Sequence, residues 1–192
     1  MKDSMDTGSL ELTKRDSLPD ALTLLLREYP RDLWEAHPGF DGLVRFWLDR
    51  HMLFRRILGM LNTETERRLD QKTDPMHFKS HISKLGSMLV GELHGHHNIE
   101  DAHYFPVLAK KDTRIARGFD LLDRDHHALD EILHRYVEAA NAAINADLKS
   151  TREVGTFLEE TRSLERLLSR HLIDEEELVV PVILKHGAND LG

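Results

Sequence analysis

One spacing pattern constrains this chain more than any other feature: a histidine followed four residues later by glutamate and ten residues later by proline. The pattern starts at His96 and again at His171, an offset of 171 − 96 = 75 residues. Two more histidines, His51 and His126, differ by the same interval, 126 − 51 = 75. The separation within each half is also constant, since 96 − 51 and 171 − 126 both equal 45. The chain therefore contains one two-segment unit repeated twice.

Each of these four histidines lies on an apolar stripe that steps by three and four residues, the periodicity of one face of an α-helix. The stripe around His51 consists of Phe40, Val44, Trp47, Phe54, Leu58 and Leu61. Turn signals separate the four helical segments at 73–75, 111–113 and 149–151. Short connections between long amphipathic helices make sequential helices antiparallel neighbours. We therefore expect an all-α fold, an up-down-up-down antiparallel four-helix bundle with a short N-terminal helical extension.

The boundaries of this bundle follow from the breaks in the pattern. Residues 18–29 predict a short amphipathic helix that ends before Pro30, and His37-Pro38-Gly39 marks the start of the main body. We expect an N-terminal extension over 1–37, the bundle over 38–187 and a tail over 188–192.

The four histidines are also expected at one level of the bundle. In an antiparallel hairpin, residues equidistant from the turn lie level with each other. The midpoint of 51 and 96 is 73.5, and the midpoint of 126 and 171 is 148.5, so both fall in predicted turns. The centre of His96 and Glu100 on the second helix is position 98. The midpoint of 98 and 126 is 112, which lies inside the remaining turn.

Histidine and glutamate four residues apart lie on the same helix face. Burying an unpaired carboxylate costs several kcal/mol, so glutamate on an inward stripe needs a partner or a metal. Imidazole and carboxylate ligands without thiolate suit iron or manganese, and less specifically zinc. Bridging glutamates favour a pair of metals, with open positions where a small diatomic molecule could bind. The candidate metal ligands are His51, His96, Glu100, His126, His171 and Glu175.

Two further residues are candidate ligands. His103 lies on the inner stripe one turn past Glu100, and Asp130 is four residues after His126. His97 and His127 adjoin stripe histidines and are expected to flank the site. The alternative to metal binding is a buried polar network.

Composition excludes several classes of function. The formal charge of −8 argues against a nucleic-acid partner, because phosphate binding needs a basic surface. The chain has no cysteine, which excludes disulfides, thiolate zinc sites and iron–sulfur clusters. The N-terminus lacks an apolar signal region, and no apolar run approaches ~18 residues, so we expect a soluble cytoplasmic protein without a membrane partner.

Four motifs together resemble one known family. A histidine on the first helix, H-H-x-x-E-D followed by Phe-Pro, D-H-x-x-L, and H-x-x-x-E-E are similar to the hemerythrin-like, histidine-rich cation-binding domain, over roughly residues 38–187. The resemblance implies two iron ions with a bridging oxo or hydroxo group. It assigns His51, His96, His126 and His171 as terminal ligands and Glu100 and Glu175 as bridges.

Two departures from the oxygen carriers narrow the expected function. Asp130 stands where carriers have a second histidine, and Glu175 follows His171 more closely than the carriers' aspartate does. Both features resemble bacterial hemerythrin-like domains and iron- or oxygen-sensing relatives.

We expect a non-haem di-iron protein that binds or senses oxygen, nitric oxide or iron. One alternative is an enzyme acting on peroxide or nitric oxide, or an iron–sulfur repair protein, although that branch carries cysteines. Another is an interaction module with a structural metal, with a protein partner or as a homodimer.

Overall fold

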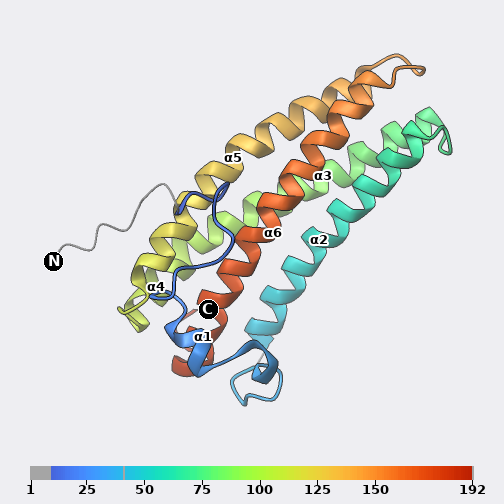
Figure 1. Ribbon diagram of the computed structural model, residues 1–192. Coiled ribbons are helices and arrows are strands. Elements are labelled where there is room, and N and C mark those ends of the chain that lie inside the picture. The colour runs from blue at the N-terminus through green and yellow to red at the C-terminus, as the bar shows by residue number, and fades with distance from the viewer. Residues whose placement is uncertain (1–9, 41, 192) are drawn as a thin grey trace. The chain divides into compact units, whose positions relative to one another are not determined.

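The structure is a computed structural model that describes residues 10–40 and 42–191. Those residues are helical with no strand, which confirms the predicted all-α helical bundle. Figure 1 shows the order of the elements. They are α1 (Leu24–Glu28), η2 (Arg31–Leu33), α2 (Gly42–Leu69), α3 (Pro75–Ile99), η3 (Glu100–Tyr104), α4 (Phe105–Lys111), α5 (Ala116–Asn145) and α6 (Arg152–His186). Within this part of the chain, no helix has the length and apolar character required to cross a bilayer.

The described chain divides into two compact units, and the boundary falls within helices. Unit 1 contains the described residues up to Arg50, then His97–Ala128, and the described residues from Ser169 onward. Unit 2 contains His51–His96 and Leu129–Leu168.

Unit 2 is built from four helical segments, with both of its turns, 70–74 and 146–151, at one end (Figure 1). The carboxylate of Asp74 caps the start of α3 by accepting hydrogen bonds from the backbone N–H groups of Met76 and His77 at 3.0 and 2.9 Å. The segments share one apolar core, whose largest buried side chains include Phe54, Leu58, Leu61, Phe78, Ile82, Leu89, Tyr136 and Phe157.

Polar contacts show which segments of unit 2 are neighbours. They join α2 to α6 through Asn62 and Glu165 at 2.7 Å and α5 to α6 through Arg135 and Glu160 at 3.3 Å. Lys79 on α3 donates at 2.5 Å to the carbonyl of Ala146, the residue that directly follows α5.

Unit 1 combines the N-terminal segment with the remaining parts of α2, α3, α5 and α6 and with all of α4. Its core contains Leu18, Leu22, Leu25, Trp34, Trp47, Phe105, Phe119 and Leu178. The predicted N-terminal helix is wrong in length, since only Leu24–Glu28 is α-helical. The N–H of Leu22 binds the carbonyl of Pro19, three residues back, so this stretch forms turns while its leucines still reach the core.

The second predicted helix is interrupted by the π-helical segment η3. Pro106 follows at the start of α4, and proline has no N–H to donate to the preceding turn. A π-helical turn widens the helix locally and rotates the following side chains about its axis. By contrast, α6 continues through Pro181 and ends at His186, where Gly187 adopts the positive φ of 76° common after a helix.

Candidate metal centre

Two buried histidines, His126 on α5 and His171 on α6, face each other in unit 1. Their Nε2 atoms are 3.1 Å apart, and their ring planes cross at 66°. Two imidazole nitrogens that bind one metal at about 2.1 Å and at right angles would be about 3.0 Å apart. The observed separation therefore matches that of two ligands on one ion.

The outer nitrogens of both rings point at carboxylates. Nδ1 of His126 lies 2.8 Å from Oδ1 of Asp101, and Nδ1 of His171 lies 3.5 Å from Oδ2 of Asp125. The first distance is a hydrogen bond, and the second is an electrostatic contact. A carboxylate behind a histidine favours the proton on Nδ1 and leaves the Nε2 lone pair free to bind a metal. Two such lone pairs would repel each other at 3.1 Å, and a cation would relieve that repulsion.

Burial also favours the neutral form of His171. Burial lowers the pKa of His171 below its ordinary value, an effect that the nearby carboxylate of Asp125 opposes. The neutral imidazole, which is the form that binds metals, is thereby favoured.

Two glutamates complete this part of unit 1. Oε2 of Glu100 lies 3.6 Å from Nε2 of His126, and Oε2 of Glu175 lies 3.6 Å from Nε2 of His171. The glutamates are 1% and 0% exposed. Burial and then the charge of Glu175 raise the pKa of Glu100 well above its ordinary value. The indole N–H of Trp47 donates to Oε1 of Glu175, which fixes that carboxylate. Buried carboxylates facing imidazole nitrogens are suitable ligands for a hard or borderline cation.

Unit 2 contains a second histidine pair with the same separation between its Nε2 atoms. Nε2 of His51 on α2 lies 3.1 Å from Nε2 of His96 on α3, with the ring planes at 88°. Phe54 packs against His96 with ring centroids 5.2 Å apart. Each histidine pair thus joins residues 45 positions apart, as the repeat predicts.

Comparison with known proteins decides the family. The sequence profile of the Hemerythrin HHE cation binding domain matches residues 42–183. The chain belongs to the hemerythrin HHE family. No match was found among curated proteins or among solved structures. The hemerythrin domain contains both histidine pairs and both glutamates, whereas the segment from Leu10 to Phe40 lies outside it.

His97 is a buried residue of the hemerythrin domain that the sequence pattern did not place inside. Its ring stacks on His126 with centroids 3.9 Å apart and meets His171 edge-on at 5.6 Å. One ring nitrogen from each of these three histidines lies within 4.8 Å of the others, so His97 is a further candidate ligand. A signal was present in the repeat, because its counterpart Leu172 is apolar and, in the structure, fully buried.

His103 and Asp130, the two further ligands that the sequence offers, belong to neither histidine pair's surroundings in the structure. His103 is exposed and lies inside η3, where the wider helical turn moves it off the inner stripe. The carboxylate of Asp130 is 59% exposed and lies 3.7 Å from Nε2 of His94. His127 is also exposed, and its Nδ1 contacts the carbonyl of Asp123.

Proposed function

We propose that this hemerythrin-family protein holds two iron ions and binds or senses a small molecule, oxygen or nitric oxide, or iron itself. In the proposal, His51, His96, His126 and His171 are terminal ligands, and Glu100 and Glu175 are bridges. The observation that carries it is the pair of buried histidines in unit 1, whose Nε2 atoms face each other at 3.1 Å with carboxylates behind and beside the rings.

The sequence repeat supports assigning His51 and His96 as ligands too. His96 precedes Glu100 by four residues, as His171 precedes Glu175. Residues four apart lie on one face of a helix, so this spacing predicts that each histidine and its glutamate are directed to the same side.

The donor set favours iron. Four imidazoles and two carboxylates, with no cysteine in the chain, match nitrogen and oxygen coordination of a first-row metal. Manganese and zinc fit less specifically. Once bound, an iron pair would supply redox chemistry and open coordination positions for a diatomic ligand.

The chain's own residues orient and shield this centre. Asp101 accepts a hydrogen bond from Nδ1 of His126, Asp125 faces Nδ1 of His171, and Trp47 donates a hydrogen bond to Glu175. The Phe105 ring stacks on His126 with centroids 5.5 Å apart and covers that ring on one side. Together these contacts fix the donor atoms before a metal arrives, which lowers the cost of binding.

The test is metal analysis of protein produced in iron-supplemented medium. We expect about two iron ions per chain, an absorption band from oxygen-to-iron charge transfer, and a spectral change on adding oxygen or nitric oxide to the reduced protein. Less than about one metal per chain and no such band would refute the proposal. Stoichiometric zinc without a redox response would instead assign a structural metal.

A further inference from the structure

Arg15 is a buried cation on the N-terminal segment, outside the part of the chain that matches the hemerythrin domain. Its side chain is 1% exposed and lies between two buried carboxylates. Nε donates to Oδ2 of Asp174 at 2.8 Å, while Nη1 and Nη2 donate to the two oxygens of Asp125. Nη1 also donates to the carbonyl of Leu10 at 2.6 Å. The guanidinium therefore joins three parts of unit 1.

One of the two carboxylates faces a proposed metal ligand, and the other follows that ligand on the same helix. Asp125 faces Nδ1 of His171 at 3.5 Å, and Asp174 follows His171 by three residues on α6. Because Arg15 binds both oxygens of Asp125, it fixes the orientation of that carboxylate. Without that cation, the carboxylate of Asp125 would be free to turn away from His171. Its loss of a fixed position would change the group that faces the outer nitrogen of His171.

The N-terminal segment is seated by contacts on both sides of Arg15. Leu12, Leu18 and Leu22 are each 6% exposed or less. Arg170, on α6, donates to the carbonyl of Asp16 at 2.5 Å. These contacts hold Arg15 beside the carboxylates, although Arg15 lies outside the part of the chain that matches the hemerythrin domain.

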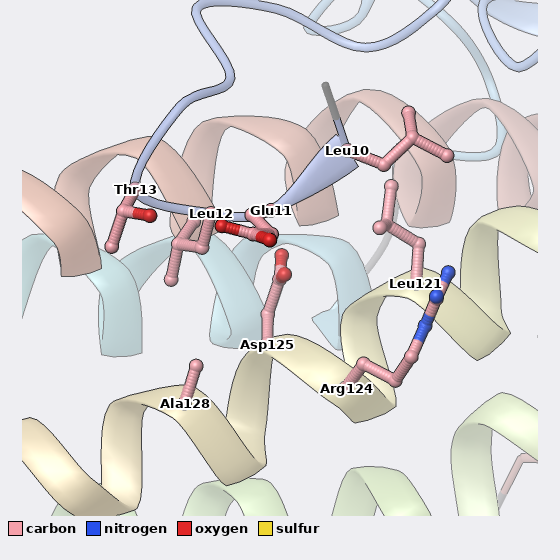
Figure 2. A pocket seen from close by; sticks show the side chains of 8 residues that line it. All are labelled: Leu10, Glu11, Leu12, Thr13, Leu121, Arg124, Asp125 and Ala128. Atoms are coloured by element: carbon pink, nitrogen blue, oxygen red, sulfur yellow. The ribbon is translucent and has the colours of Figure 1, made fainter. Parts of the chain in front are cut away.

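Figure 2 shows how the segment covers Asp125: its carboxylate points from α5 toward the chain at Leu12 and Glu11. A pocket of about 280 Å³ lies there, lined by Leu10, Glu11, Leu12, Thr13, Leu121, Arg124, Asp125 and Ala128. The stretch from Leu10 to Thr13 therefore lines the same pocket as Asp125. Displacing that stretch would open Asp125 to water.

We propose that Arg15 is a positioning residue of the metal centre: it fixes Asp125, and through it His171, so the N-terminal segment must be seated for full cation affinity. The proposal rests on the proposed metal-binding function. Coupling between two sites is reciprocal, so metal binding also stabilises the seated segment.

The test compares Arg15→Met with Arg31→Met. Arg31 also links the N-terminal region to α6, through Glu176 at 2.6 Å, but it does not contact a carboxylate behind a histidine. Affinity for ferrous iron is measured by competition with a chelator under anaerobic conditions. We expect a loss of about 10–100-fold for Arg15→Met, the range for groups that support a metal ligand, and little change for Arg31→Met. In the Asp125→Asn background, Arg15→Met should cause no further loss, because its effect passes through Asp125.

A second readout uses the metal-free protein. ¹⁵N NMR of the histidine rings reports which nitrogen of His171 carries the proton. We expect a lower fraction of the Nδ1–H form in Arg15→Met than in wild type or Arg31→Met. If Arg15→Met does not fold, Arg15→Lys retains the charge but cannot bind both carboxylates with a planar fork, and it should show an intermediate loss of affinity.

The outcomes separate this proposal from the proposed function. If wild type binds no iron, the proposed function fails, and the NMR comparison still tests whether Arg15 positions His171. If wild type binds iron and Arg15→Met binds it equally well with an unchanged His171 signal, the role of Arg15 is overturned alone. Equal losses in Arg15→Met and Arg31→Met would also overturn it, because any loosening of the segment would then suffice.

Discussion

Asp101 accepts a hydrogen bond from Nδ1 of His126 at 2.8 Å and thereby turns the Nε2 atom of that ring toward His171. Asp101 lies in η3, one residue after Glu100, so the π-helical segment contributes both a proposed ligand and the support for another. π-helical turns are frequent at functional sites because they change the direction of side chains within one helix. In this protein, two consecutive residues of the π-helical turn, Glu100 and Asp101, both face His126.

The first prediction concerns this support. Asp101→Ala removes the acceptor that holds His126, and we expect iron affinity to fall about 10–100-fold. Asp123→Ala is the matched control, because it removes the same charge from an exposed position on α5. Chelator competition measures both variants. Equal affinities in the two variants would show that Asp101 has no part in orienting His126.

The second prediction separates the proposed ligands from the remaining sequence candidates. Glu100→Ala and His171→Ala remove buried donor atoms, and we expect each to lower the metal content to less than half that of wild type. His103→Ala and Asp130→Ala alter exposed residues and should leave the metal content unchanged. Elemental analysis of the four purified variants is sufficient. A loss of metal in His103→Ala would return that residue to the ligand set.

Much of the fold could be predicted because the helical spacing of apolar residues is a short-range pattern in the sequence. Stripe residues such as Val44, Phe54 and Leu58 are buried as the helical spacing requires. The turns fall at 70–74, 112–115 and 146–151, in agreement with the predicted breaks. The histidine pairs followed from an interval of 45 residues that recurs in both halves and has its midpoint in a turn each time.

Other features of the site depend on information that periodicity does not contain. Periodicity predicts a flanking position for His97 because an ideal stripe is narrow, whereas in the structure the ring of His97 is buried and stacks on His126. Periodicity predicts a stripe position for His103 because the π-helical turn of η3 has no simple spacing signal. Arg15 contacts residues 110 and 159 positions away, so no local pattern could connect it to Asp125 and Asp174.

The third prediction is a pH dependence of the metal-free protein. Burial raises the pKa of Glu100 above its ordinary value of 4.5, so the folded state keeps a proton that the unfolded state releases. The free energy of unfolding should therefore fall as pH rises from 4.5 through the raised pKa. Glu100→Gln lacks this loss and should be more stable than wild type at pH 7 by about 1–3 kcal/mol when metal is absent. Urea unfolding across this pH range measures the difference.

Two comparisons control the third prediction. Glu159→Gln changes an exposed glutamate and should leave the pH profile of wild type unchanged. Adding iron should reverse the order of wild type and Glu100→Gln, since a ligand that binds only the folded state adds about 2.7 kcal/mol at a hundredfold excess over its Kd. Parallel profiles for Glu100→Gln and metal-free wild type would contradict the assignment of the raised pKa.

The fourth prediction uses two helical glycines to test packing in each unit. A Cβ atom at Gly118 in unit 1 would lie 2.7 Å from Cδ2 of Leu178, a side chain that is fully buried. Gly118→Ala should therefore destabilise the protein by about 1–3 kcal/mol through overpacking. In unit 2, a Cβ at Gly91 on α3 would meet nothing within 4 Å, so Gly91→Ala should stabilise it by about 0.5–1 kcal/mol through the higher helix propensity of alanine. Urea unfolding of the metal-free variants measures both, and a stabilised Gly118→Ala would show that Leu178 moves aside at no cost.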